Sequence, residues 1–274
     1  RRYVGRILYV VRAVRLESFH ACIVVASEVE HWTLGSDARL ERMISYLFAT
    51  KARGPVWEFY FSDGSSATDI WFLSESDADH GGCVRTGRST SGWILWFRHG
   101  EKSRAAVDSG CKRQSVAAFS TAHSEIGAIK DSWVRSVFPA LGAWEQVLCR
   151  NIFARHLVDS DAARKAVVKG LSLPLRYMRK AHRITLAGLH DMSKQLSLER
   201  VDSIHNTSDV LTKPMDLETL TRHLFVLGYF ELEYRGRRKS HEQQEQQQPA
   251  KKQKAMFAGL RRLVGNALAM RIED

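Results

Sequence analysis

Four acidic residues stand at the ends of expected secondary-structure elements, where side chains from distant parts of a chain can meet. Asp77 and Asp159 follow apolar runs that are typical of strands, and sites on open α/β sheets usually lie at strand ends. Glu125 lies in the first turns of an expected helix, and Asp209 follows a stretch that is typical of a helix cap. Each position alone also has an ordinary structural explanation, because aspartates commonly end strands and acids commonly occupy first helical turns.

Four carboxylates in one cluster would require cations, because like charges held close together repel one another. Oxygen ligands suit Mg²⁺ or Mn²⁺, and two such ions about 4 Å apart would activate a water and stabilise the leaving oxygen in phosphodiester cleavage. Asp79 and Asp161 lie two residues from Asp77 and Asp159 and could face the same way along a strand. They stay open as alternative ligands, whereas Glu75 is expected to be solvated.

Strand and helix patterns alternate between about residues 55 and 230. The expected strands are Val56–Phe61, Ile70–Ser76, Ser91–Phe97, Ser115–Ser120, Phe153–Val158 and Val201–His205, of which the first two would form a hairpin. The expected helices are Thr121–Leu148, interrupted at Pro139, then Ala162–Lys169 and Leu217–Phe225. From Ile70 onward the order is β-β-β-α-β-α-β-α, which predicts an α/β sandwich with a mixed sheet. Trp93 and Trp96 are expected to pack on that sheet.

The flanking segments differ in composition from this central part. Residues 1–52 carry apolar positions at helix spacing in two runs, from Val4 to Val14 and from Leu40 to Phe48, and are predicted to be helical. Residues 235–274 are basic and rich in glutamine, so we expect disorder with a short helix near Met256–Met270. This tail is either a nucleic-acid-binding arm or a solvated appendage. The expected segments are therefore 1–52, 55–230 and 235–274.

The bulk composition favours a polyanionic partner. The net charge of the 274 residues is +11, and lysines and arginines gain binding energy by releasing the counterions condensed on nucleic acid. The four cysteines form no CxxC pair and are expected to be free thiols in a reducing compartment. The sequence contains no run of about eighteen apolar residues, so no membrane span is indicated. The first residues show no signal-peptide pattern and begin without Met, so a piece of a longer chain is expected.

Several short strings resemble the ribonuclease H domain of copia-type retrotransposon polyproteins, in that family's order and with suitable spacing. SDAD at 76–79 and RSTSGW at 88–93 resemble its SDADWAG and RKSTSGY, and CKRQSVA at 111–117 resembles its SKKQKTVA. STAHSE at 120–125 resembles SSTEAEY, VDS at 158–160 resembles CDN, and SDVLTKP at 208–214 resembles ADILTKP. VGRILYV at 4–10 and LERMISYLFATK at 40–51 resemble the segment that follows the reverse-transcriptase core. The resemblance covers about residues 4–228.

This resemblance implies a ribonuclease H-like fold, with a five-stranded mixed sheet flanked by helices, and a nuclease that cuts the RNA strand of RNA–DNA hybrids during retrotransposon reverse transcription. It implies two Mg²⁺ ions, for which Mn²⁺ may substitute chemically. Asp77 would bridge both ions, and Glu125 would hold the first ion and help to place the attacking water. Asp159 would complete the site of the first ion, and Asp209 would complete the site of the second. The implied partners are the hybrid and the reverse-transcriptase part of the same polyprotein, of which residues 1–52 would be a connection remnant. No membrane is implied, and the setting would be a cytoplasmic virus-like particle or the nucleus.

Substrate contacts are expected from two further groups of residues. Lys112, Arg113 and Gln114 would contact phosphates, and the hydroxyl groups of Ser89, Thr90 and Ser91 would donate hydrogen bonds to them. The resemblance also suggests that His190 assists product release, against the plainer interpretation of an ordinary half-buried histidine.

Departures from the family pattern leave a second hypothesis open. His80 replaces the family's Trp, His123 and Ser124 replace Glu and Ala, and Gly127 lies inside an expected helix at a cost of about 1 kcal/mol relative to Ala. The alternative is a decayed, inactive retrotransposon fragment that retains at most nucleic-acid binding. A third hypothesis, an integrase-type transferase, is discounted. Such enzymes need a different spacing of acids, and the LTKP string at 211–214 does not belong to them.

Overall fold

The computed structural model describes residues 2–57, 69–100, 103–172 and 186–231. The prediction for residues 235–274 lies outside the described residues, as does most of the expected strand Val56–Phe61 with its hairpin. The chain divides into two compact units, one of residues 1–31 and 57–214, the other of residues 32–56 and 215–274. The expected segments 1–52, 55–230 and 235–274 stay a prediction.

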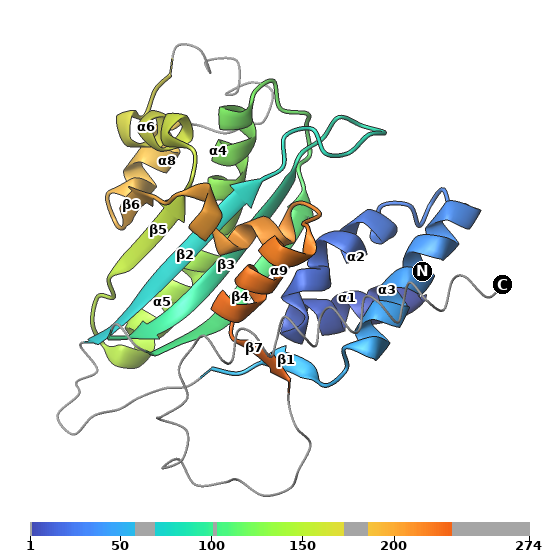
Figure 1. Cartoon of the computed structure of the whole chain (residues 1–274). Coiled ribbons are helices and arrows are strands. Elements are labelled where there is room, and N and C mark those ends of the chain that lie inside the picture. Colours follow the sequence, from blue (N-terminus) through green and yellow to red (C-terminus); the bar gives the residue numbers. More distant parts are fainter. Residues whose placement is uncertain (1, 58–68, 101–102, 173–185, 232–274) are drawn as a thin grey trace, which may run out of the picture. The chain divides into compact units, whose positions relative to one another are not determined.

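The first unit is built on a five-stranded sheet of order β4-β3-β2-β5-β6 (Figure 1). Strands β2, β3 and β4 are antiparallel neighbours, whereas β5 and β6 are added in parallel to β2. The strands are β2 (Ile70–Ala78), β3 (Thr90–His99), β4 (Ser103–Arg113), β5 (Ala154–Val158) and β6 (Ser197–Arg200). This mixed five-stranded sheet with flanking helices confirms the predicted α/β fold class.

Helices cover one face of the sheet and enclose the hydrophobic core. They are α4 (Thr121–Ser132), α5 (Phe138–Leu148), α6 (Asp161–Lys169) and α8 (Leu186–Ser193). Phe72 and Leu95 on the strands pack against Ile126, Ile129 and Trp133, all fully buried. A single π-helical turn, Trp133–Val137, joins α4 to α5 just before Pro139. Proline cannot continue regular helix geometry, so the predicted interruption at Pro139 is confirmed.

Two strand predictions were wrong, both at the edges of the sheet. Ser115–Ser120 is irregular, and the third strand is the earlier segment Ser103–Arg113. Val201–His205 is not a strand either, because β6 ends at Arg200 and Ser203–His205 form a 3₁₀ turn. Edge strands are often short and polar, and the polar, small-residue sequences of β4 and β6 carry little of the apolar alternation that identifies a strand.

The N-terminal segment of this unit packs on the sheet through its second helix. It consists of α1 (Arg2–Val14), the 3₁₀ turn η1 (Leu16–Ser18) and α2 (Phe19–Ala26). The first helix matches one of the two predicted helical runs. Helix α2 lies between those runs, within the segment predicted to be helical, and shows no periodic pattern because its sequence FHACIVVA is apolar on every side. Phe19, Cys22 and Val25 of α2 are buried, and the helix lies against β4.

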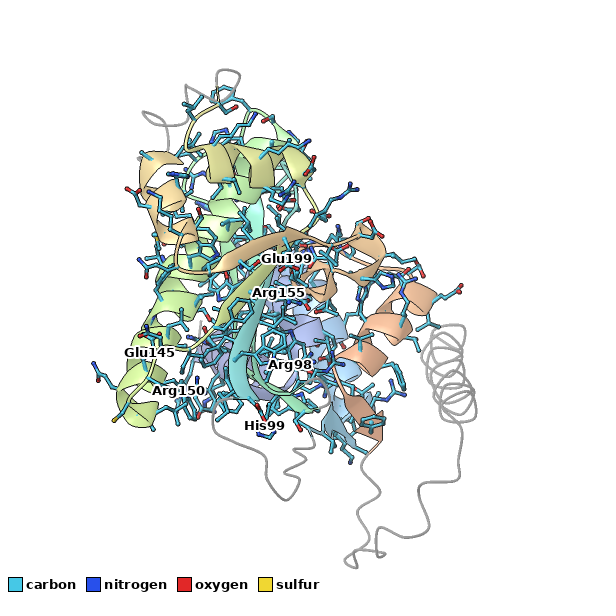
Figure 2. The ribbon with its side chains drawn as sticks, turned by 90° about the vertical axis from the view of Figure 1, so that its left-hand side faces the viewer. Arg98, His99, Glu145, Arg150, Arg155 and Glu199 are labelled. Carbon is cyan, nitrogen blue, oxygen red and sulfur yellow. The ribbon has the colours of Figure 1, made fainter. Side chains whose placement is uncertain are left out.

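Two guanidinium groups lie over an indole ring near the start of β2. The guanidinium groups of Arg98 and Arg155 lie 5.1 and 5.4 Å from the Trp71 ring centroid. Arg155 on β5 also pairs with Glu199 on β6, with Nε 3.1 Å from Oε1 (Figure 2). Trp93 and Trp96 are buried on the strands, as predicted.

The second unit contains α3 (Leu34–Ala49), β1 (Arg53–Pro55), α9 (Leu217–Val226) and β7 (Tyr229–Glu231). Its two strands pair antiparallel, with Gly54 opposite Phe230. Each helix begins at a side-chain cap: Thr33 accepts from the Ser36 amide, and Asp216 accepts from the Thr219 amide. Both helix predictions are confirmed. Across the described residues of both units, no helix is long and apolar enough to cross a membrane.

Candidate functional site

Three of the four predicted acids meet at one end of the sheet. Asp77, Glu125 and Asp159 each offer a carboxylate oxygen, and these oxygens lie within 4.8 Å of one another. Two of the acids come from neighbouring parallel strands, β2 and β5. Their register pairs Glu75 with Leu157, so two residues further on Asp77 lies beside Asp159. The carboxyl ends of parallel strands share one edge of a sheet, which is why two acids so far apart in sequence meet here.

Glu125 reaches this edge from the helix that crosses the strands. Ser120 caps α4 by accepting a hydrogen bond from the His123 amide at 3.2 Å, and Glu125 lies in the second turn. Its Oε1 accepts a 3.4 Å hydrogen bond from the Ala78 amide. Its Oε2 is buried and has no hydrogen-bond partner among the described residues. A buried carboxylate oxygen without a partner is costly, and a bound cation would supply one.

The fourth acid, Asp209, comes from a 3₁₀ helix, η5 (Thr207–Leu211). It is not one of the three acids within 4.8 Å, but a lysine links it to them. Lys213 Nζ lies 2.9 Å from Asp209 Oδ2 and 3.8 Å from Asp77 Oδ2. The Thr212 hydroxyl donates a hydrogen bond to the same Asp77 oxygen. The predicted quartet therefore forms one electrostatic group, with a cation of the protein at one side of it.

Burial and mutual repulsion disfavour the ionised forms of Glu125, Asp159 and Asp209. Burial raises the pKa of Glu125 well above its usual range, and the charges of Asp77 and Asp159 raise it further. Burial, followed by the charge of Asp77, raises the pKa of Asp159 and brings the pKa of Asp209 to about 7. Burial lowers the pKa of Lys213, but the surrounding carboxylates outweigh it and the net shift is upward. The cluster thus favours bound positive charge.

A set of buried hydrogen bonds holds η5 against β2. Glu75 accepts from both the backbone amide (3.1 Å) and the hydroxyl of Thr207. Asn206 donates from Nδ2 to the Ser76 carbonyl at 3.1 Å, while its Oδ1 caps η5 by accepting from Ser208. The expectation that Glu75 is solvated was therefore wrong: it is 6% exposed. Its side chain shares a face of β2 with Asp77, and η5 covers that face.

Glycine permits the close approach of η5 to the sheet. A Cβ added at Gly92 on β3 would lie 2.6 Å from Thr212 Cγ2 and 2.8 Å from Leu211 Cβ. Gly127 on α4, which was expected to cost stability inside a helix, allows a similarly close approach between α4 and Gln114. An added Cβ there would lie 2.7 Å from Gln114 Nε2.

Most of the expected substrate-contact residues are internal. Ser89, Thr90, Ser91 and Gln114 are at most 4% exposed. Gln114 Nε2 donates to Ser91 Oγ at 3.0 Å and to the Ser124 carbonyl at 2.8 Å, which ties β4 to α4. Burial of this kind favours a structural role over contact with phosphates.

Lys112 and Arg113 are partly exposed and partly engaged. Lys112 Nζ lies 3.9 Å from Asp131 Oδ1, with its side chain 40% exposed. Arg113 donates from Nη1 to Cys83 Sγ at 3.0 Å. These two side chains are better placed to reach a polyanion than the four buried neighbours.

The alternative acids face other partners. Asp79 accepts a hydrogen bond from the Thr90 amide, which closes the loop between β2 and β3. Asp161 lies in the first turn of α6 and pairs with Arg164 (2.8 Å) and Lys165 (2.6 Å). Neither belongs to the group of three acids within 4.8 Å. The geometry therefore favours Asp77 and Asp159 over Asp79 and Asp161.

His190 lies on α8, packed against the left-handed Gly170 that ends α6. A Cβ added at Gly170 would come within 3.0 Å of His190 Cβ. The ring is half-buried, and its Nδ1 has no hydrogen-bond partner among the described residues. This packing suits an ordinary half-buried histidine, and an auxiliary role stays a prediction.

Sequence reasoning missed the residues that hold the cluster in place. Glu75, Asn206 and Thr212 carry no catalytic signal of their own, although Thr212 and Lys213 belong to the string that pointed to Asp209. The donor set of carboxylate oxygens fits hard divalent cations such as Mg²⁺. The buried, unpartnered Glu125 Oε2 and Asp209 Oδ1 are the atoms that such ions would satisfy.

No family model and no curated protein matches the chain. Part of it is similar in fold to solved ribonucleases H. Ribonuclease H1 of the archaeon Halobacterium salinarum is 15% identical, with a TM-score of 0.32, over 52% of this chain and 93% of that one. The N-terminal ribonuclease H domain of a Mycobacterium tuberculosis protein is 14% identical, with a TM-score of 0.35, over 57% and 98%.

A viral structure is similar to the same extent. The foamy viral protease–reverse transcriptase in complex with an RNA/DNA hybrid is 12% identical, with a TM-score of 0.31, over 57% of this chain and 20% of that one. Likenesses with TM-scores this low carry no argument about function. Function has to be argued from the residues of the acid cluster and their surroundings.

Proposed function

We propose that this chain is a ribonuclease H, which hydrolyses the RNA strand of RNA–DNA hybrids. The observation that carries the proposal is the meeting of Asp77, Glu125 and Asp159 within 4.8 Å at one edge of the sheet. Asp209 joins them through Lys213. Each of the four acids lies in one of the strings that resemble copia-type ribonuclease H. A chance cluster would not be expected to bring together three acids, with a fourth linked to them by Lys213, that the sequence resemblance also selects.

The four carboxylates divide between two Mg²⁺ sites in this proposal. Asp77, Glu125 and Asp159 would hold one ion, and Asp77 with Asp209 would hold the second. Two bound ions would supply a more acidic water and neutralise the charge that develops on the leaving oxygen. Mn²⁺ offers similar coordination chemistry and is expected to substitute.

The side chains of the protein orient the reacting groups. Glu125 Oε2, which has no hydrogen-bond partner among the described residues, can accept a hydrogen bond from the attacking water. The oxygen of this water forms a bond to phosphorus while the bond from phosphorus to the 3′ oxygen breaks. The products are a 3′-hydroxyl on one fragment and a 5′-phosphate on the other. Thr212 and the η5 anchors keep Asp77 and Asp209 in place.

The net charge of +11 supports a polyanionic substrate. Of the residues predicted to contact phosphates, Lys112 and Arg113 are the ones proposed for this role. They are the last two residues of β4. The strings at 4–10 and 40–51 support a place in a copia-type polyprotein, beside its reverse transcriptase. The hybrid would then arise during reverse transcription, in a cytoplasmic virus-like particle or in the nucleus.

Cleavage of a hybrid with a labelled RNA strand tests the proposal. The full chain is incubated with Mg²⁺ and the hybrid, beside the variants Asp77→Asn and Asp161→Asn. We expect metal-dependent cutting of the RNA strand by the unaltered chain, none by Asp77→Asn, and undiminished cutting by Asp161→Asn.

Asp161→Asn is the matched control, because the same chemical change is made two residues from Asp159 but outside the cluster. Circular dichroism establishes that each variant is folded. A folded, unaltered chain that binds the hybrid without cutting it would contradict the proposed activity and favour the decayed fragment. Loss of cutting in Asp161→Asn alone would move the site to the alternative acids.

A further inference from the structure

Lys213 lies where the acid cluster would otherwise need a second cation. Its Nζ is 2.9 Å from Asp209 Oδ2 and 3.8 Å from Asp77 Oδ2. The side chains of the two aspartates are 10% and 2% exposed. On the other side of Asp77, Glu125 Oε2 has no hydrogen-bond partner among the described residues. The two halves of the cluster therefore differ: Lys213 forms ion pairs within one, whereas among the described residues no ion pair reaches Glu125 or Asp159 in the other.

This asymmetry has a consequence for ion binding. An ion that enters beside Glu125 and Asp159 meets negative charge and an unpartnered oxygen. An ion that enters between Asp77 and Asp209 also meets an oxygen without a hydrogen-bond partner among the described residues, Asp209 Oδ1, but it meets the ammonium group as well. Two like charges at such a distance repel strongly where water is scarce. The second ion can bind there only if the ammonium group withdraws.

The lysine side chain has room to withdraw, whereas its backbone does not. The Lys213 amide donates to the Asp209 carbonyl at 3.3 Å, and Thr212 is held by its hydrogen bond to Asp77. The Lys213 side chain is 41% exposed. Its four-carbon stem can turn toward solvent without moving η5, since lysine is a flexible point charge.

We infer that Lys213 is a built-in counter-ion that makes the two cation sites unequal, so that one divalent ion binds tightly at Asp77, Glu125 and Asp159 and a second binds weakly, in competition with the lysine. This inference rests on the proposed metal-dependent function, and it concerns the free protein before any nucleic acid is present. In the free chain, Lys213 pairs with both Asp209 and Asp77. The second ion then has to displace an existing ion pair.

Direct titration with Mn²⁺ tests this inference without any activity measurement. Free Mn²⁺ is followed by electron paramagnetic resonance at pH 7.5 as the full chain is titrated, with no nucleic acid present. We expect one tight site in the unaltered chain. In Lys213→Gln we expect a second site whose apparent Kd falls by about tenfold or more, since a nearby positive charge has been removed.

Two further variants separate the local effect from general ones. Lys213→Arg keeps the charge and is expected to retain the unequal sites. Lys194→Gln removes the same charge from an exposed pair with Asp191, whose Nζ–Oδ1 distance is 2.9 Å, and is expected to change neither site. Thermal melts with and without Mn²⁺ show whether each variant is folded and whether the ion stabilises it.

The other outcomes each contradict something definite. Equal affinities in the unaltered chain and Lys213→Gln would overturn the role of Lys213 and leave the proposed function standing. Loss of the tight site in Lys213→Gln, in a folded protein, would show that Lys213 organises the cluster instead of competing with an ion. Failure of every folded variant to bind Mn²⁺ would overturn the inference and the proposed metal-dependent function together.

Discussion

Among single residues, Glu125 shows most clearly how the cluster is strained without a cation. It is 5% exposed, one of its oxygens has no hydrogen-bond partner among the described residues, and Asp77 and Asp159 lie close by. Burial, followed by those charges, raises its pKa above the value that it has in the unfolded chain. At a pH between the unfolded and the folded pKa, Glu125 therefore keeps a proton in the folded protein that it releases in the unfolded chain. Stability from this source is complete below the unfolded pKa and is lost as pH rises through the folded pKa.

Replacing Glu125 with Gln should consequently stabilise the cation-free protein in a pH-dependent way. We expect little difference in unfolding free energy near pH 4 and a gain of about 2 kcal/mol near pH 8, because the variant has no buried charge to form. Urea unfolding in the presence of a chelator measures this difference. Mg²⁺ should stabilise the unaltered chain more than the variant. A gain that is constant across pH would show that repulsion among the acids is not its cause.

At the scale of elements, the short helix η5 determines where Asp209 lies. Glu75 anchors it by accepting from Thr207, and Asn206 anchors it by donating to the β2 backbone. Gly92 on β3 has no Cβ and so leaves space for it. None of these residues belongs to the predicted quartet. The position of Asp209 is thus the property of a packed element, held by a buried carboxylate on the neighbouring strand.

Changing Glu75 should loosen η5 specifically. In Glu75→Leu the Thr207 amide and hydroxyl lose their acceptor, at a cost of about 1–3 kcal/mol, and we expect the Thr207 amide to exchange its hydrogen much faster. Glu75→Gln keeps an acceptor oxygen and should retain most of the protection. Ser74→Ala is the control, because Ser74 bonds to Ser132 on the opposite face of β2. Equal protection of Thr207 in all three variants would rule out Glu75 as the anchor.

The elements also show why some features could be predicted and others could not. Strands β2, β3 and β5 and helices α4, α5 and α6 were predicted, because their apolar residues enter the core and leave a periodic pattern. Strand β4 was misplaced and no separate run was predicted for α2, since one has few apolar residues and the other has them on every side. The four acids were found because each ends or begins an element. Glu75 was misjudged, because its partner Thr207 lies 132 positions away along the chain.

For the molecule as a whole, charge is the property that most affects its encounter with a polyanion. Residues 235–274 contain ten Lys and Arg against four Asp and Glu, which is a net +6 of the total +11. Cationic groups that contact phosphates make binding dependent on salt, with a slope of about 0.9 per neutralised phosphate on duplex DNA. Whether the tail is a nucleic-acid-binding arm or a solvated appendage can therefore be read from a salt titration.

If the tail contacts the hybrid, replacing Lys251, Lys252 and Lys254 with Gln in the full chain should weaken binding at low salt. The slope of the logarithm of the association constant against the logarithm of the salt concentration should decrease in magnitude by about 1 to 3. Fluorescence anisotropy of a labelled hybrid, in chelator to prevent cutting, measures this slope. Lys194→Gln serves as the control for a lysine elsewhere on the surface. An unchanged slope would identify the tail as an appendage.

The central claim is that the carboxylate cluster uses water to cut RNA paired with DNA. The most direct measurement uses a DNA–RNA–DNA chimeric strand paired with DNA, incubated with the full chain and Mg²⁺, followed by mass analysis of the product ends. We predict cuts confined to the RNA part, with 3′-hydroxyl and 5′-phosphate ends, and no cuts by Asp77→Asn. Ends carrying a 2′,3′-cyclic phosphate, or cuts that persist in Asp77→Asn, would contradict the claim.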